Sequence, residues 1–559
     1  MQTLNEYPRP QLERDSYICL NGMWDYAISK FDTFPDKYDG KINVPFSPET
    51  PLSGVNKIVH PDEWLFYKTE LKFHKGFIKD KVILHFGAVD QIAEVFINNT
   101  FVGKHVGGFL PFSFDIKPYL KEKKNILTVR VKDVTDTSYY SRGKQALKRG
   151  GIWYTPQSGI YMPVWMESVS EGYIEKLKIT PNIDKHQVTI KVISSSETAT
   201  IKIGRNTYET PCNVDCVIDV NNPKLWSPDS PYLYKFTVKT PTDSVNSYFA
   251  MRKISIVKGA DGEKLIALNN QPFFMRGVLD QGYYRQGFLT PSCDEDYIKD
   301  IELMKKLGFN VSRKHIKIES LRWYYHCDRL GLLVWQDFVS GGEKYKLGII
   351  SLPLITDVHI SDKHYSLFGR KNLQGRIEAE QEFEDTIDLL YNCPCIVLWT
   401  IFNEAWGQFD AKRIYKKMVQ LDPTRIYDHA SGWHDQGVSD TKSYHVYFRR
   451  FKTPRKSKIK NRALILSECG GYALPVKGHT FTSVNFGYKM LRNSEALENE
   501  YKKFIELDIL PNIPKGLTAF IYTQLSDVED ELNGFVTYDR EVVKVDLSTI
   551  EALNKKATY

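Results

Sequence analysis

Two unbroken apolar segments, each followed by a glutamate, constrain the fold of this chain more than any other feature. Residues 396–402 read Ile-Val-Leu-Trp-Thr-Ile-Phe and lead into Asn403 and Glu404, and residues 463–466 lead through one serine into Glu468. A strand that is apolar without alternation is typical of a parallel sheet covered on both faces. Residues just beyond such strands meet at one mouth when the sheet closes into a barrel. We therefore expect the two carboxylates to share one pocket.

From about residue 258 to the end, the sequence alternates between apolar strands and helical periods. Helical spacing of apolar residues is found in 294–307, 320–330 and 380–390. Eight candidate strands cover residues 273–278, 309–313, 332–338, 396–402, 425–430, 443–447, 463–467 and 517–523. Eight strands separated by helices are what a (β/α)₈ barrel requires.

The residues before 258 show no sustained helical period. Residues 1–170 contain short alternating segments such as 64–71, 82–86, 93–97 and 126–131, separated by turn signals, which predicts a β-sandwich. Residues 171–257 add the segments 173–179, 188–192 and 234–238, and their spacing suits an immunoglobulin-like sandwich. Three domains agree with a length of 559 residues.

Composition narrows the class of protein. The hydrophobic fraction of 42% and the charged fraction of 26% are ordinary for a globular chain, and no segment has the ~20 apolar residues that span a bilayer. The start lacks the pattern of a signal peptide, and the eight cysteines do not form a zinc pattern, so we expect a cytoplasmic enzyme with reduced thiols.

One segment, 449–460, is strongly basic, while the net charge of the whole chain is only +7. It could contact nucleic acid, but it holds a single aromatic residue, Phe451, and lies between two barrel strands. A solvated loop is the favoured interpretation, so we expect neither a nucleic-acid nor a membrane partner.

Paired carboxylates at short range are the machinery of glycoside hydrolysis, which needs no metal and no cofactor. A dense acidic segment, 527–531, does not follow the spacing of a calcium loop, and we expect hydrogen bonding in its place.

Several motifs carry a family resemblance along nearly the whole chain. They are Gly-Ala-Val-Asp at 87–90, the segments 105–112 and 159–165, Leu-Trp-Ser-Pro-Asp-Ser-Pro at 225–231, and the segments 250–254 and 268–277. In this order the chain resembles glycoside hydrolase family 2, the family of β-galactosidases, β-glucuronidases and β-mannosidases. The resemblance implies a sugar-binding-like jelly-roll sandwich over 1–170, an immunoglobulin-like sandwich over 171–257 and a catalytic TIM barrel over 258–559.

The resemblance also implies roles for the residues at the strand ends. Glu404, after the fourth strand, would be the general acid/base, and Glu468, after the seventh, the nucleophile of a retaining double displacement. Asn403 would donate to the sugar 2-hydroxyl, and Arg313 would hold Glu468 ionised and oriented.

Five further positions are weaker candidates for substrate binding. The familiar galactosidase pattern after the arginine is absent, since this chain has Arg-Lys-His-Ile-Lys at 313–317, which leaves the role of His315 open. Asp337 either contacts substrate or supports its neighbours, and Trp433 is either a stacking platform or a core residue. Tyr444 or His445 would hydrogen-bond the nucleophile, with Tyr444 preferred.

The sugar is the least constrained expectation. An exo-acting enzyme releasing a terminal β-galactoside is our leading hypothesis, with β-glucuronide, β-mannoside and α-L-arabinoside as alternatives. The Asn-x-Lys signature of the glucuronidases is replaced by Asn-Phe-Gly-Tyr-Lys at 485–489, although Lys477 and Lys489 keep that alternative open. A transglycosylase and a non-catalytic carbohydrate-binding protein are the other classes, and a homo-oligomer is expected by analogy.

Overall fold

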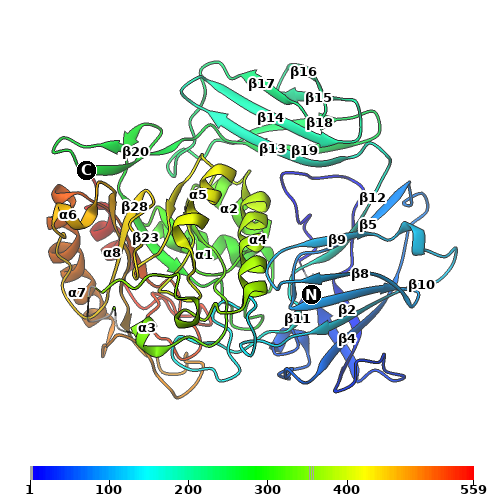
Figure 1. The fold of residues 1–559 in the computed structure, drawn as a ribbon, viewed down its shortest axis with the longest axis horizontal. Coiled ribbons are helices and arrows are strands. Elements are labelled where there is room, and N and C mark those ends of the chain that lie inside the picture. The colour runs from blue at the N-terminus through cyan, green and yellow to red at the C-terminus, as the bar shows by residue number, and fades with distance from the viewer. Residues whose placement is uncertain (1–3, 352, 354–355, 357) are drawn as a thin grey trace.

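The computed structural model describes residues 4–351, 353, 356 and 358–559, which form two β-sandwiches beside a barrel (Figure 1). The barrel occupies one side of the molecule and the two sandwiches lie against it. Among the described residues, no helix combines the length and the apolar character that crossing a bilayer requires.

The first sandwich packs a four-stranded sheet against a six-stranded one. The sheet orders are β1-β12-β5-β9 and β3-β2-β4-β10-β7-β8, with β6 and β11 as a separate pair. Alternating positions such as Leu84, Val95 and Val129 point into its core. The strands are β1 (Ile18–Cys19), β2 (Gly22–Ser29), β3 (Gly40–Val44), β4 (Trp64–Leu71), β5 (Lys81–Phe86), β6 (Val89–Asp90), β7 (Ile92–Ile97), β8 (Thr100–Val106), β9 (Phe112–Asp115), β10 (Asn125–Lys132), β11 (Gly159–Ile160) and β12 (Val164–Val169).

The second sandwich has a three-stranded sheet, β13-β14-β17, and a four-stranded sheet, β16-β15-β18-β19. In β14 every second residue is buried, as expected for a strand with one face on a core. The strands are β13 (Ile174–Asn182), β14 (Gln187–Ser194), β15 (Thr198–Ile203), β16 (Asn206–Pro211), β17 (Asp215–Asp219), β18 (Tyr234–Lys239) and β19 (Ser244–Phe249).

A small antiparallel sheet of β20 (Ile254–Lys258), β21 (Lys264–Leu268) and β22 (Gln271–Pro272) leads into the barrel. The domain boundary expected at 257/258 therefore falls inside a strand. The backbone N–H of Ile266 donates to Thr518 Oγ1 at 2.9 Å, so this sheet packs beneath the start of the last barrel strand.

Eight parallel strands form the barrel, in the order β27-β26-β25-β24-β23-β32-β29-β28. The two end strands meet through side chains: Thr441 Oγ1 donates to the Tyr427 carbonyl at 3.2 Å, and Ser443 Oγ donates to Asp428 at 3.1 Å. The strands are β23 (Met275–Asp280), β24 (Val311–Lys314), β25 (Leu333–Asp337), β26 (Ile396–Thr400), β27 (Ile426–Asp428), β28 (Thr441–Val446), β29 (Ala463–Gly470) and β32 (Leu517–Thr523).

Every residue of β26, β29 and β32 is buried, because their inner faces fill the barrel and their outer faces meet helices. The helices are α1 (Asp294–Lys306), α2 (Leu321–Leu330), α3 (Leu347–Ser351), α4 (Leu373–Leu390), α5 (Ala411–Leu421), α6 (Lys456–Ile459), α7 (Ser494–Phe504) and α8 (Leu547–Lys555). A short strand pair, β30 (Tyr472–Ala473) and β31 (Lys489–Met490), lies between β29 and α7. The expected fold class, a jelly-roll sandwich, a second sandwich and a TIM barrel, is confirmed.

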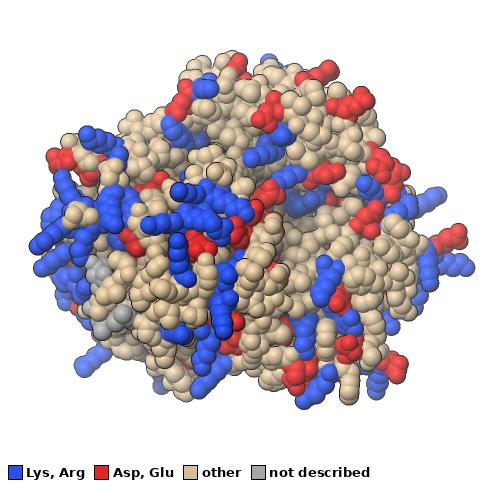
Figure 2. Space-filling view, in the orientation of Figure 1, with Lys and Arg blue, Asp and Glu red and all other residues tan. Residues whose placement is uncertain are grey.

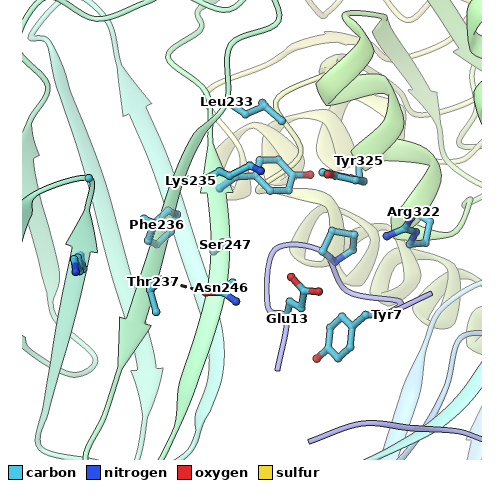
Figure 3. Close-up of a pocket in the computed structure, with 14 residues that line it drawn as sticks. Tyr7, Glu13, Leu233, Lys235, Phe236, Thr237, Asn246, Ser247, Arg322 and Tyr325 are labelled. Carbon is cyan, nitrogen blue, oxygen red and sulfur yellow. Dashed lines mark hydrogen bonds between the residues drawn. The ribbon is translucent and has the colours of Figure 1, made fainter. Parts of the chain in front are cut away.

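A cavity of about 500 Å³ lies where the N-terminal segment, β18–β19 and α2 meet (Figure 3). Tyr7 and Glu13 border it from the N-terminal segment, and Tyr325 from α2. Its lining includes none of the expected site residues. The candidate site lies elsewhere, at the carboxyl ends of the barrel strands.

Candidate active site

The carboxyl ends of three barrel strands bring two glutamates and a histidine together. Glu404 follows β26, Glu468 lies near the end of β29, and His445 lies near the end of β28. His445 Nδ1 is 2.7 Å from Glu404 Oε1 and 3.5 Å from Glu468 Oε2, and facing atoms of the three residues lie within 4.8 Å of one another. This spacing fits the ~5–5.5 Å between carboxyl groups in retaining glycosidases, whereas inverting enzymes need ~6.5–9.5 Å.

Glu468 is surrounded by hydrogen-bond donors. Arg313 NH1 donates to Oε1 at 2.9 Å, and the Tyr447 hydroxyl donates to Oε2. The side chain is buried, and burial alone would raise its pKa. The charges of His445 and Arg313 outweigh that effect and lower the pKa of Glu468 to about 2, so the carboxylate is ionised at neutral pH.

Arg313 is fully buried and organises this side of the pocket. Its Nε donates to both oxygens of Asp337 at 3.0 and 3.1 Å, and its NH2 donates to Asn403 Oδ1 at 2.7 Å. His315 Nδ1 lies 2.7 Å from Asp337 Oδ2. Asp337 thus balances the buried guanidinium and orients the His315 ring, which is a supporting role for that carboxylate.

Asn403 presents a free donor to the pocket. Because its carbonyl oxygen accepts from Arg313, its amide group is fixed with Nδ2 on the other side. That nitrogen is buried and has no hydrogen-bond partner among the described residues. A buried amide without a partner costs about 1–3 kcal/mol, and a substrate hydroxyl would remove this cost.

Glu404 is held in a different environment. Burial raises its pKa, the nearby Glu468 charge raises it further, and the hydrogen bond with His445 opposes both effects. Its backbone and that of Ala405 are left-handed, with φ of 46° and 65°. Such a conformation in a non-glycine residue costs about 1–3 kcal/mol and is frequent at active sites. The turn aims the carboxyl at the pocket.

The remaining expected residues occupy the rim and the core. The Trp433 ring centroid lies 6.3 Å from that of His445, and Trp433 is buried, so it forms part of the pocket wall. His315 is also buried, and burial together with the charge of Lys144 lowers its pKa to about 4. Its ring is neutral at pH 7.

The tyrosine that bonds Glu468 is Tyr447, where the sequence favoured Tyr444. The Tyr444 ring lies 4.7 Å from Lys442 Nζ and 6.5 Å from the Phe451 ring, on the outer side of the strand. The reason is the alternation of side chains along the strand: His445 and Tyr447, two residues apart, both face the pocket, and Tyr444 lies on the opposite face.

The segment 485–489 adds an aromatic wall. The Tyr488 ring stacks on Tyr447 with centroids 3.8 Å apart and planes 6° apart. Lys489 Nζ lies 2.6 Å from Glu500, and the Lys489 side chain is exposed, so it faces away from the pocket.

Sequence reasoning missed the part that the first sandwich contributes. A loop between β10 and β11 reaches over the barrel, where the Trp153 ring lies 5.2 Å from Trp406. Lys144 Nζ lies 5.9 Å from the Trp406 ring and 5.3 Å from the Tyr154 ring. The Lys144 charge also acts on Glu404, lowering its pKa against the effect of burial. No periodic signal marks this loop.

The acidic segment 527–531 holds that loop in place. Arg149 NH1 contacts Glu529 at 3.1 Å and Asp530 at 3.2 Å, and the Tyr154 hydroxyl donates to Glu531 at 2.6 Å. The hydrogen bonding expected for this segment is therefore present, and it joins the first sandwich to the barrel.

Two groups of described residues place potential metal ligands within 4.8 Å of one another: Glu404, His445 and Glu468, and also His479, Asp539 and Glu541. In the first, both oxygens of Glu468 accept protein hydrogen bonds. In the second, His479 Nδ1 contacts Asp539 and Arg285 NH1 contacts Glu541. We assign a metal to neither group.

Comparison with known proteins identifies the family. The family models "Glycosyl hydrolases family 2, sugar binding domain", "Glycosyl hydrolases family 2" and "Glycosyl hydrolases family 2, TIM barrel domain" match residues 29–166, 170–252 and 260–478. A β-galactosidase of Thermoanaerobacter pseudethanolicus is 26% identical over 384 residues, covering 64% of this chain and 46% of the relative. A putative β-glucuronidase of Formosa agariphila is 25% identical, covering 68% and 36%. The chain spans less than half the length of these curated relatives.

Solved structures share the whole fold. The β-D-glucuronidase of Dictyoglomus thermophilum has a TM-score of 0.78 at 18% identity, covering 99% of both chains. A β-galacturonidase of Eisenbergiella tayi has a TM-score of 0.72 at 17% identity, covering 99% of this chain and 98% of its own. With its three domains matched in order, the chain belongs to glycoside hydrolase family 2.

Proposed function

We propose that this protein is a retaining, exo-acting glycosidase that releases a terminal sugar. One observation carries the proposal: two glutamates at barrel strand ends face each other within 4.8 Å, and their pKa values are shifted in opposite directions. A pair of carboxyls with separated pKa values supplies an acid and a nucleophile at the same pH.

The chemistry follows from these protonation states. Ionised Glu468 attacks the anomeric carbon while protonated Glu404 donates its proton to the departing oxygen, which leaves a glycosyl ester on Glu468. Glu404, now ionised, takes a proton from water, and the water attacks the anomeric carbon and frees Glu468. Asn403 Nδ2 donates to the sugar 2-hydroxyl, a contact that strengthens as positive charge develops on the ring.

The closed pocket supports exo-action. Glu404 is 6% exposed and Glu468 4% exposed. The loop that carries Lys144 and Trp153 overhangs the barrel mouth, leaving room for a chain end in preference to the middle of a polysaccharide.

A β-galactoside is the leading substrate, since β-galactosidases recur among the curated relatives. A β-uronide is the second candidate, and Lys144 favours it. This buried cation has no ion pair with a described acid, and its charge acts on both Glu404 and His315. A sugar carboxylate would supply the missing counter-charge.

The test is hydrolysis of nitrophenyl glycosides by the wild type and by Glu468→Ala. The panel contains the β-galactoside, β-glucuronide, β-galacturonide, β-mannoside and α-L-arabinoside. We expect one sugar to dominate and the variant to lose at least about 10⁴-fold in kcat. Activity that survives in the folded variant would contradict the role of Glu468.

Lys144→Met separates the two substrate candidates, with Lys148→Met as its control because Lys148 is exposed on the same loop. If a uronide is the substrate, only Lys144→Met should raise KM for it, by roughly 10- to 100-fold for loss of a buried charge contact. For a galactoside, the two variants should differ much less.

We also propose that the enzyme works in a reducing compartment, in keeping with the cytoplasmic location expected above. All eight cysteines carry free thiols, and five of them are buried.

A further inference from the structure

The segment 448–462, called here the basic loop, is the strongest concentration of charge in the chain that the proposed chemistry does not use. It contains eight Lys and Arg residues and no Asp or Glu. It begins one residue after the end of β28, following Tyr447, and includes α6. Figure 2 shows Lys and Arg side chains gathered on the side of the molecule where Figure 1 places α6 and β28.

Most of this charge is not neutralised by the protein. Arg450 pairs with Asp508, and Arg462 pairs with Asp435, both at 2.6 Å. Five other cations are exposed and form no ion pair within the described part of the chain, namely Arg449, Lys452, Arg455, Lys456 and Lys460. Like charges in one short segment repel one another. An anion that binds there would lower the electrostatic free energy of the loop.

The basic loop is continuous with the catalytic pocket. Tyr447 donates to Glu468, and the next residue, Phe448, is 68% exposed. The Phe448 ring lies 5.6 Å from the Tyr488 ring, which in turn stacks on Tyr447. Aromatic faces of this kind stack on sugar rings. A path of aromatic rings therefore leads from Glu468 to the start of the basic loop, where Arg449 follows Phe448 in the chain.

We propose that the basic loop binds an acidic glycan, a polysaccharide or oligosaccharide bearing carboxylate or sulfate groups, whose chain end enters the pocket. The aromatic path favours sugar rings, and the cations favour anionic substituents on the sugars beyond the one that is cleaved. Its use in catalysis rests on the proposed glycosidase function, but binding at the loop does not require turnover.

The test measures binding of the whole protein to polygalacturonate, to dextran sulfate and to neutral galactan by affinity electrophoresis. The variant is Lys452→Gln/Arg455→Gln/Lys456→Gln. The matched control, Lys121→Gln/Lys123→Gln/Lys124→Gln, also removes three exposed charges, from the turn before β10 in the first sandwich. The two variants therefore have the same net charge.

We expect the basic-loop variant to bind the acidic glycans roughly tenfold more weakly than the control at ~0.1 M salt, because exposed charge contacts are individually weak. The difference in affinity between the two variants should decrease as the salt concentration rises. The two variants should bind neutral galactan equally. Stronger retardation by polygalacturonate than by dextran sulfate would identify carboxylate as the recognised group, and the reverse order would identify sulfate.

Two results would overturn the inference. Equal loss in both variants would mean that only net charge matters, and tighter binding of single-stranded DNA than of either acidic glycan would make the loop a nucleic-acid surface. Because the measurement needs no hydrolysis, it stands apart from the nitrophenyl panel, whose failure would refute the glycosidase proposal instead.

Discussion

Glu404 and Glu468 lie at the carboxyl ends of the fourth and seventh barrel strands and are similarly buried, yet their pKa values are shifted in opposite directions. Around Glu468 lie Arg313 and Tyr447, which both donate to its oxygens. The Glu404 carboxyl has one side-chain hydrogen bond within the described residues, with the His445 ring, and its pKa is raised. Burial raises the pKa of both carboxyls and His445 lowers both, whereas Arg313 contacts Glu468, so the fixed guanidinium is the main asymmetry between them.

Two residues of the same type can therefore serve as an acid and a nucleophile when their neighbours differ. Here one buried cation is placed asymmetrically with respect to the two carboxyls. The guanidinium of Arg313 donates to Glu468 with NH1 and to Asn403 Oδ1 with NH2. Exchanging or weakening these neighbours should therefore erase the difference between the two glutamates.

The largest expected effect is on the chemistry. Glu468→Gln should lower kcat/KM by about 10⁴-fold or more for every leaving group, because no covalent step remains. Glu404→Gln should lower kcat/KM by about 10²–10⁴-fold for alkyl leaving groups. The loss should be far smaller for dinitrophenyl glycosides, because the dinitrophenolate leaves without being protonated. The measurement is kcat/KM across a series of aryl glycosides.

The control for this series is Gln436→Ala, a half-buried residue of the barrel outside the pocket contacts described above. The assignment of roles would be reversed if Glu468→Gln were the variant with the steep dependence on the leaving group.

A smaller effect is expected in the pH dependence of kcat/KM. Activity should fall as the pH rises through the pKa of Glu404, since the acid must be protonated. The acidic limb belongs to Glu468, whose pKa is about 2, so little loss is expected down to about pH 4. Tyr447→Phe removes a donor to Glu468 and should move the acidic limb upward.

A steady-state profile of the wild type and Tyr447→Phe between pH 4 and 9 checks this. A wild-type acidic limb above pH 5 would show that the cation does not control Glu468. Tyr444→Phe, on the outer side of the same strand, is the matched variant and should leave the limb in place.

The smallest effect is on stability. A carboxyl whose pKa is raised by folding stabilises the fold below its unfolded pKa, and this contribution is lost as the pH rises through the folded value. Glu404→Gln should therefore raise the melting temperature at pH 7, by about 1–3 °C. For Glu468 the pKa is lowered, so its contribution is present at pH 7 and is lost only as the pH falls towards 2.

Glu468→Gln should accordingly lower the melting temperature at pH 7, where it leaves Arg313 with one fewer counter-charge. Differential scanning calorimetry at pH 7 and pH 4.5 gives the comparison. The advantage of Glu404→Gln should shrink at the lower pH, and an advantage independent of pH would point to packing.

The sequence predicted the barrel closely because its strands are encoded locally. Each of the eight predicted segments overlaps one observed strand, and both glutamates follow runs that are buried on two faces. The positions of Asn403 and Arg313 follow from the same strand ends.

What the sequence could not predict depends on geometry between distant segments. Tyr447 bonds Glu468 from just beyond the end of β28, and a one-residue change in the register of that strand would have turned Tyr444 inward in its place. Lys144 and Trp153 reach the pocket from a loop of another domain, and their position depends on contacts with Glu529 and Glu531.

Those last contacts join residues near position 150 to residues near position 530, so they form late in the synthesis of this domain arrangement. The first sandwich leaves the ribosome long before the acidic segment has been translated. Its loop then has no partner, because Arg149 and Tyr154 must wait for Glu529, Asp530 and Glu531. The pocket is therefore completed only after residues 529–531 have been translated, and a chain stopped at residue 525 would contain Glu404 and Glu468 without the wall that encloses them.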